Sequence, residues 1–283
     1  MAGATARGWL LGADLGGTKG LLGLFEPGAS RPALQLRYAC AEFTGFEQML
    51  ARFLEDAAAR LGAEAARPVQ ACIALAGPVE GPRARMTNLP WTIDASALRR
   101  RFALGPVRLA NDFVAAAAGV DALQPSGYRE LQAGEPWPEA PRVIVGPGTG
   151  LGAAMMFPVG RSWRIVGGEG GHLGLAPRDA LESALLQWLW QAHGRVSAER
   201  VLCGPGLVSI YRFLAERDGA SQSDALLAED DPAQAISAAA LEACRESAPD
   251  DGRVGHGMRA ERQAALPGEA GQTARSVHAA RAV

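Results

Sequence analysis

The sequence predicts an α/β protein built from two domains, and three observations support this fold class. The chain has 283 residues, which is enough for two domains of ordinary size. Short apolar runs typical of β-strands alternate along it with segments whose apolar residues recur at helical spacing. A strand–glycine turn–strand unit also occurs twice, around Gly16 and again around Gly148, and this repetition suggests a duplicated architecture.

The composition is that of a globular protein, with 48% hydrophobic and 20% charged residues. A net charge of −2 gives no field that would attract nucleic acid or an acidic membrane. We find no secretory pattern at the start and no apolar stretch of about 18 residues, so we expect no membrane partner and a cytoplasmic location. The four cysteines are far apart, and their spacing does not predict a zinc site.

The first glycine turn is Asp14-Leu-Gly-Gly-Thr18, between the apolar runs 9–13 and 21–25. Glycines there let backbone N–H groups face an anion, and Asp14 could hold a hydrated Mg²⁺. The spacing differs from the GxxxxGK[ST] pattern of the P-loop. A plain hairpin explains this motif alone equally well.

The second glycine turn, Gly146-Pro-Gly-Thr-Gly150, follows the apolar strand predicted over 142–145. Residues 148–153 match the loose GxGxxA dinucleotide fingerprint, but that fingerprint must open a helix. The residues that follow, 153–157, are typical of a strand that stops at Pro158. We therefore predict a second strand–glycine turn–strand unit and do not expect a hydride-transfer enzyme.

The remaining elements are predicted from periodicity and from their end signals. Gly62 closes the first predicted helix, and Asp94 is the N-cap of the second. A loop rich in proline, glycine and glutamate is expected over 125–141. The predicted helices cover 46–61, the residues after Asp94, 113–120, 181–193 and 206–216, and the further strands cover 70–76, 107–110 and 163–166.

Asn111 and Asp112 lie at a predicted strand-to-helix junction. A helix N-terminus favours negative charge, which would keep the carboxylate of Asp112 ionised and able to accept a hydroxyl proton. Asn and Asp are also the preferred N-cap residues, so capping is the simpler interpretation of these two residues taken alone.

The run Gly168-Glu-Gly-Gly-His172 is hard to explain by core packing. Its glycines allow a ligand to approach the backbone closely, and Glu169 and His172 offer acceptor and donor atoms for hydroxyl groups. We predict that this run contacts a polyhydroxylated substrate. Further along, Ser197 could cap a short helix, whereas no local signal separates a functional Glu199 from an ordinary surface charge.

Together these segments resemble bacterial glucokinases. The cysteine-rich zinc motif of the related repressor–kinase family is absent, which favours the simple, non-repressor type. The resemblance covers roughly residues 8–240. It is carried by Asp14–Thr18, Thr87-Asn88, Asn111-Asp112-Phe113, Gly148–Gly152, Gly168–His172, Val196–Arg200 and Gly204–Leu207.

The resemblance implies a two-domain actin-like ATPase (hexokinase-type) fold with a cleft between the domains, and phosphorylation of glucose by ATP. Asp112 would be the general base, and the sugar hydroxyls would be bound by Asn111, Glu169, His172 and Glu199. Asp14 would hold Mg²⁺ through water. Members are usually cytoplasmic and often dimeric. The ATP phosphates would be cradled by Ala13, Asp14, Leu15, Gly16, Gly17, Thr18, Gly148, Thr149 and Gly150.

The expected domains are a small one over 1–110, a large one over 111–240, and an atypical tail over 241–283. The last part of the chain has few large apolar residues, so burial of apolar surface cannot offset the entropy lost on ordering it. We expect this tail to be disordered, or to consist of out-of-frame residues that a frameshift has put in place of the true C-terminus. Weak ATP binding would follow. The alternatives are therefore a kinase for another hexose, or a catalytically impaired sugar-binding remnant.

Overall fold

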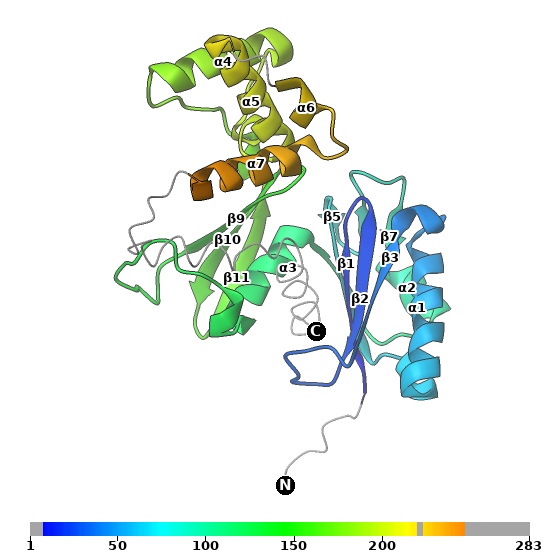
Figure 1. Ribbon diagram of the computed structural model, residues 1–283. Helices are drawn as coiled ribbons and strands as arrows, with labels where there is room; N and C mark the ends of the chain where they lie inside the picture. The colour runs from blue at the N-terminus through cyan, green and yellow to red at the C-terminus, as the bar shows by residue number, and fades with distance from the viewer. Residues whose placement is uncertain (1–7, 220–222, 247–283) are drawn as a thin grey trace. The chain divides into compact units, whose positions relative to one another are not determined.

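The computed structural model describes residues 8–219 and 223–246 (Figure 1). Most of the predicted tail, residues 247–283, lies outside this range. Its first residues, 241–246, differ from the expectation because they form the end of helix α7 (Pro232–Glu246). This segment is rich in alanine and other strong helix formers, which explains the helix. No helix in the described part of the chain is both long and apolar enough to cross a membrane.

The described chain forms two compact units. Unit 1 comprises residues 8–142 and 156–166, and unit 2 comprises residues 143–155 and 167–246 apart from the gap at 220–222. Residues 111–142 thus group with the residues before them. The predicted domains, 1–110 and 111–240, divide the chain at a different place and remain a prediction.

Unit 1 is organised around a five-stranded sheet in the order β3-β2-β1-β4-β8. Strands β1, β4 and β8 run parallel, whereas β2 is antiparallel to both of its neighbours. The carboxyl ends of the three parallel strands therefore lie at one edge of the sheet. The strands are β1 (Leu10–Leu15), β2 (Lys19–Phe25), β3 (Leu34–Ala39), β4 (Gln70–Leu75) and β8 (Val107–Asn111).

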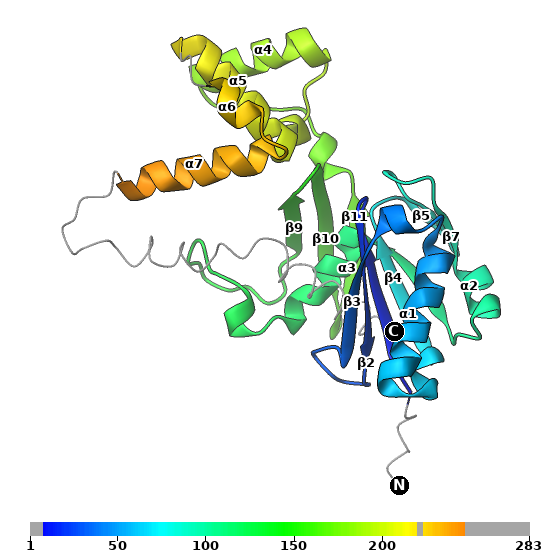
Figure 2. The same ribbon diagram turned by 45° about the vertical axis from the view of Figure 1, so that its right-hand side comes forward.

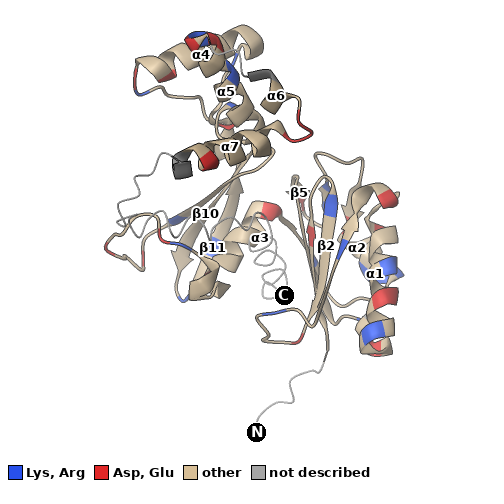
Figure 3. Ribbon diagram, in the orientation of Figure 1, with Lys and Arg blue, Asp and Glu red and all other residues tan. Residues whose placement is uncertain are grey.

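Helices cover both faces of this sheet. Figures 1 and 2 show α1 (Phe46–Leu61) and α2 (Ala95–Arg101) on one face and α3 (Asp112–Gly119) on the other. Helix α1 buries its apolar side in the main core and ends at Gly62, whose φ of 98° suits glycine. Its acidic and basic residues alternate along the ribbon (Figure 3), as expected for the solvent side of an amphipathic helix.

Unit 1 also contains a second, small sheet. It consists of β5 (Val79–Glu80), β6 (Arg83–Arg85) and β7 (Thr92–Asp94), in the order β5-β6-β7. The predicted N-cap is confirmed: the Asp94 carboxylate accepts hydrogen bonds from the amides of Ser96 (2.8 Å) and Ala97 (3.0 Å). The hydrogen bond from Ala97 and the contact with Arg83 lower the pKa of Asp94.

A three-stranded sheet carries the second glycine turn. Its strands β9 (Arg142–Pro147), β10 (Leu151–Val159) and β11 (Ser162–Gly168) have the order β11-β10-β9. Because β10 is a strand, the rejection of the dinucleotide fingerprint is confirmed. Alternate residues of one strand point to the same face, and on this sheet several such apolar side chains are exposed: Val143, Val145, Met155, Phe157, Val159 and Val166.

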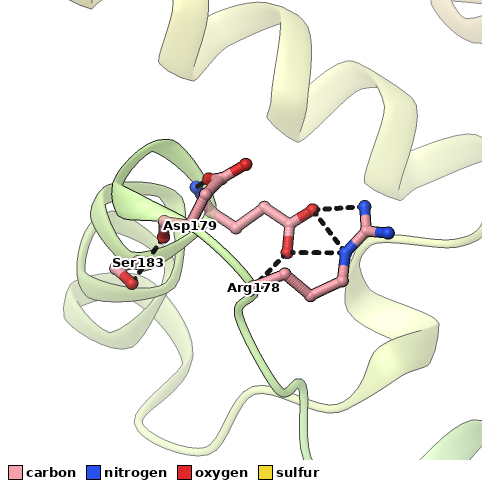
Figure 4. Close-up of polar contacts among 4 residues, drawn as sticks. Arg178, Asp179 and Ser183 are labelled. Carbon is pink, nitrogen blue, oxygen red and sulfur yellow. Dashed lines mark hydrogen bonds and ion pairs between the residues drawn. The ribbon is translucent and has the colours of Figure 1, made fainter.

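The rest of unit 2 is helical and has a small core of Leu185, Leu189, Val196 and Phe213. Helix α4 starts with a fully formed polar cap (Figure 4): the Asp179 carboxylate accepts from the amide of Glu182 at 2.8 Å, and Arg178 donates to the Glu182 carboxylate at 2.7 Å. That side-chain contact lowers the pKa of Glu182. The helices are α4 (Ala180–His193), α5 (Gly204–Asp218), α6 (Ser223–Leu227) and α7.

Candidate active site

Two of the predicted segments, the first glycine turn and Asn111-Asp112, lie at the same carboxyl edge of the unit 1 sheet. Leu15 pairs with Leu75, and Leu75 pairs with Asn111. The first glycine turn follows Leu15 directly, and Asp112 follows Asn111. Because neighbouring strands are about 4.8 Å apart, the turn and Asp112 begin roughly 10 Å from each other across the sheet.

The first glycine turn, residues 16–18, is held by backbone hydrogen bonds. The Gly16 amide donates to the Lys19 carbonyl at 2.9 Å, and the Cys40 amide donates to the Thr18 carbonyl at 2.8 Å. A Cβ on Gly17 would lie 2.9 Å from the Cβ of Asn88. The glycine is therefore required by the close approach of Asn88, one of the residues that carry the family resemblance.

Asp14 lies within β1 and is only 6% exposed. A buried carboxylate is costly unless it has polar or cationic partners. Within the described residues no three His, Cys, Asp or Glu side chains gather to hold a metal. A single carboxylate suits Mg²⁺, which keeps most of its water ligands, better than it suits a metal that needs a protein cage.

The structure divides the roles of Asn111 and Asp112. Asn111 caps α3, since its side-chain oxygen accepts from the amides of Phe113 (3.0 Å) and Val114 (3.3 Å). Its amide group also donates to the Gly77 carbonyl at 3.4 Å. Asp112 is then the first helical residue, half-buried, and accepts from the Phe113 amide at 2.9 Å. The capping that the sequence allowed for either residue is performed by Asn111.

The second glycine turn, residues 148–150, borders a pocket of about 800 Å³ within unit 2. The Gly204 amide at the start of α5 donates to the Gly148 carbonyl at 2.9 Å, which fixes this helix end against the turn. The N-terminal ends of α5 and α7 both reach the pocket. The lining includes Val145, Gly148, Thr149, Leu151, Leu202, Gly204, Pro232 and Gln234.

This pocket combines two kinds of surface. Helix N-termini and glycine turns favour anions, whereas its valine and leucine side chains favour an apolar group. Both helix ends are capped: the Cys203 sulfur accepts from the Gly206 amide at 3.3 Å, and the Asp231 carboxylate accepts from the Gln234 amide at 3.1 Å. The apolar lining therefore suits an apolar part of a ligand, and the glycine turn is the part of the pocket that favours an anionic part.

Glu169 and His172 lie together around the short 3-10 helix η5 (Gly170–His172). The His172 Nε2 and Glu169 Oε2 atoms are 3.4 Å apart, and these side chains are 55% and 88% exposed. The backbone beneath them is fixed, because Arg195 donates to the His172 carbonyl at 2.7 Å. Both polar groups are thus accessible to a ligand.

Glu199 is not the solvated surface charge that the sequence left open. It belongs to the 3-10 helix η6 (Ala198–Arg200), and its Oε2 accepts from the Leu151 amide at 2.9 Å. Helix η6 is tied to the neighbouring η5 segment, because the Ala198 amide donates to the Leu173 carbonyl at 2.8 Å. Ser197 occupies the N-cap position of η6, but its side chain makes no capping hydrogen bond.

The predicted site residues therefore fall into two sets. Unit 1 brings together the segment 13–18 with Asn111 and Asp112, and unit 2 brings together the turn 148–150 with Glu169, His172 and Glu199. Sequence reasoning missed Leu151 and the pocket-lining ends of α5 and α7. The motif around Gly204 was a usable signal for α5, whereas nothing in the sequence marks Leu151, which acts through its main chain.

Two glycine turns, each between two strands, and a buried acid beside the first match the actin-like, hexokinase-type fold that the resemblance implies. Solved structures agree. A glucokinase from an Antarctic psychrotroph is 29% identical, with a TM-score of 0.63, and the match covers 75% of this chain and 65% of that one. A ROK family glucokinase from Streptomyces griseus, solved with glucose and AMPPNP, shares the fold at 23% identity and a TM-score of 0.50, covering 86% of this chain and 72% of that one.

The glucokinase family model matches residues 11–249, and the chain therefore belongs to the glucokinase family. The match continues past residue 240, where the resemblance was expected to end. A curated relative, the glucokinase of Nostoc punctiforme, is 37% identical over 219 residues, which cover 76% of this chain. The aligned part is 62% of that relative's own length, so the chain spans less than two thirds of it.

Proposed function

We propose that this protein transfers the γ-phosphoryl group of ATP to the 6-hydroxyl of glucose, the first step of glycolysis, in the cytoplasm. The observation that carries the proposal is the register of Leu15, Leu75 and Asn111, which sets Asp112 about 10 Å from a glycine turn suited to phosphate. Membership of the glucokinase family supports the substrate pair.

In the proposed reaction the sugar oxygen attacks the γ-phosphorus while the bond to the β–γ bridging oxygen breaks and ADP leaves. The hydroxyl proton passes to the carboxylate of Asp112. General-base help of this kind contributes on the order of 10²- to 10⁴-fold to the rate. The remaining acceleration comes from positioning and from neutralising charge on the phosphates.

Asn111, Glu169, His172 and Glu199 are proposed to hold the sugar hydroxyls. Amide, carboxylate and imidazole groups can each pair with a hydroxyl as donor or acceptor. A site built on such hydrogen bonds discriminates strongly against an analogue that lacks one hydroxyl, since one of its polar groups is then left unpaired.

The two glycine turns are proposed to cradle the ATP phosphates, and the pocket beside residues 148–150 is proposed to take the adenosine part. The solved neighbour from Streptomyces griseus is described with AMPPNP, an ATP analogue, which supports a nucleotide ligand. Asp14 would hold Mg²⁺ through water, and the bound ion would neutralise phosphate charge. We expect a homodimer and no nucleic-acid or membrane partner.

The test is ADP release with glucose by the full chain and by Asp112→Asn. We expect the variant to lose about 100-fold or more in kcat while its glucose affinity, measured by calorimetry, stays within a fewfold of wild type. Glu130→Gln, in the exposed loop after the short 3-10 helix η4 (Pro125–Gly127), is the matched acid-to-amide control and should keep full turnover. Normal turnover by Asp112→Asn would exclude Asp112 as the base.

Two alternatives remain to be separated from glucose phosphorylation. A panel of hexoses in the same assay distinguishes a kinase for another sugar. The other alternative is a catalytically impaired sugar-binding protein, as expected if the C-terminal elements of the adenine site are missing. Tight glucose binding with no ADP formation at saturating ATP would support that second function.

A further inference from the structure

The main chain of Leu151, the first residue after the second glycine turn, is contacted from two sides by the elements that carry the candidate sugar residues. Its amide donates to the Glu199 carboxylate at 2.9 Å. Its carbonyl oxygen lies only 2.2 Å from the position that a Cβ on Gly171 would take. Helices η5 and η6 therefore both rest on the end of the turn.

At Gly150 a side chain would displace the same carboxylate. A Cβ at this position would lie 2.5 Å from Oε2 and 3.2 Å from Cδ of Glu199. Gly150 does not have a positive φ, so its backbone conformation is open to any residue. The space occupied by Glu199 is thus the reason for the glycine.

Glu199 contacts the turn without lining the pocket. Gly148, Thr149 and Leu151 line the pocket, whereas within the described chain Gly150 and Glu199 are outside its lining. The carboxylate therefore contacts the Leu151 amide without taking space in the pocket. The turn remains available for phosphate while Glu199 holds it in place.

The carboxylate has a second oxygen to use. Among residues 8–219 and 223–246 the structure gives Glu199 one hydrogen bond, through Oε2, and Oε1 is left to accept from a ligand hydroxyl. We propose that Glu199 couples the sugar site to the nucleotide turn: a sugar hydroxyl on one oxygen fixes the carboxylate, and the other oxygen fixes the Leu151 amide. This inference rests on the proposed function and makes Glu199 a positioning residue for the turn.

The coupling has a measurable consequence. A turn that the sugar has already ordered loses less conformational freedom when phosphate binds, so each substrate tightens the binding of the other. By linkage the two factors are equal, and couplings of this type amount to about 5- to 150-fold. In the wild type the dissociation constant for glucose should therefore fall about 5-fold or more in the presence of AMPPNP.

The sharpest test changes the turn and measures the sugar. Gly150→Ala places a methyl group against Glu199 and should weaken glucose binding about 5-fold or more, measured by calorimetry without nucleotide. Gly134→Ala, in the exposed loop outside both turns, is the matched glycine-to-alanine control, because its Cβ would meet nothing within 4 Å. Its glucose affinity should equal that of wild type. Equal glucose affinity of both variants would overturn the coupling.

A second measurement examines the contact directly. Hydrogen exchange of the Leu151 amide should be faster in Glu199→Ala and close to wild type in Glu199→Gln, whose amide oxygen can still accept the hydrogen bond. Unchanged exchange in Glu199→Ala would also overturn the inference. If wild type itself failed to bind glucose, the proposed function would fall, whereas the exchange result would still decide whether Glu199 holds the turn.

Discussion

The two glycine turns have the same local form in different surroundings. Residues 16–18 join β1 to β2, and residues 148–150 join β9 to β10, each with two glycines and one threonine. In both, a backbone amide from elsewhere in the same unit holds one turn carbonyl: Cys40 donates to Thr18, and Gly204 donates to Gly148. The chain thus builds the same turn twice.

The turns differ in where their carboxylate comes from. Asp14 lies two residues before the first turn, inside strand β1, and the residues on either side of it, Ala13 and Leu15, are fully buried. The corresponding position before the second turn is Gly146, and there the carboxylate comes from Glu199 on η6. The first turn therefore follows a buried strand that carries its own carboxylate, whereas the second turn is contacted by one side chain from η6 that can also bind a ligand. The form of each turn is therefore set by its local sequence, whereas the carboxylate beside the second turn is supplied by tertiary packing.

The largest effect is expected where η5 meets the strand that leaves the second turn. Gly171→Ala would put a Cβ 2.2 Å from the Leu151 carbonyl oxygen, a backbone atom that cannot move aside. We expect a loss of about 2 kcal/mol in the free energy of unfolding, measured by urea titration. Gly174→Ala, whose Cβ would meet nothing within 4 Å, is the control and should unfold like wild type. Equal stability of the two variants would contradict the close packing.

The next prediction distinguishes Asp14 from Glu199 by the Mg²⁺ dependence of nucleotide binding. If Asp14 holds Mg²⁺ through water, Asp14→Asn should raise the Mg²⁺ concentration needed for nucleotide binding about 10- to 100-fold. Glu199→Gln should leave this Mg²⁺ dependence unchanged, because Glu199 belongs to the other turn. Fluorescent-nucleotide titrations at several Mg²⁺ concentrations make the comparison. An identical shift in both variants would show that the carboxylates do not have separate roles.

A smaller effect concerns the strands that carry the second turn. Asp121 pairs with Arg142, at the start of β9, and accepts from the indole of Trp163 on β11 at 2.8 Å, while Arg142 stacks on that indole. Asp121→Asn should cost about 1 kcal/mol or less of unfolding free energy, since the pair is half exposed. A double-mutant cycle with Arg142→Gln checks the pairing, and strict additivity would show no interaction.

The smallest effect is a dependence on pH. Hydrogen bonds lower the pKa of Asp94 in unit 1, mainly from the Ala97 amide, and the pKa of Glu182 in unit 2, mainly from the Arg178 side chain. Each carboxylate contributes its stability fully above its unfolded pKa of about 4 and loses it as the pH falls through the lower folded value. Urea midpoints measured from about pH 6 downward should show this decline.

The matched variant for this effect is Asp94→Asn. Asparagine can still cap α2 but does not titrate, so the urea midpoint of this variant should decline less steeply with falling pH than that of wild type. Parallel pH profiles of the two proteins would contradict a role for the Asp94 carboxylate in this decline.

Much of the fold was predictable because its signals are local. The apolar stripe and Gly62 predicted α1, and Asp94 predicted the start of α2. Strand β3 (Leu34–Ala39) was missed because it is an edge strand that mixes polar and apolar residues, and the two- and three-residue strands β5, β6 and β7 are too short for a periodic signal.

The candidate site was predictable residue by residue, but its contacts were not. Which of Asn111 and Asp112 caps the helix depends on backbone geometry, and the sequence allowed both. Glu199 reaches the Leu151 amide across 48 positions of sequence, and no local pattern encodes such a contact. The role of each unit's residue set in catalysis remains a prediction.

The position of Leu151 affects how this protein can be studied by mutagenesis. Its contribution comes from one N–H group and one carbonyl, which every amino acid except proline supplies alike. A scan that replaces side chains would therefore report on the Leu151 side chain in the pocket and would miss these main-chain contacts. Replacing the peptide linkage before Leu151 by an ester, which deletes the N–H and keeps the side chain, is the change that would reveal the hydrogen bond to Glu199.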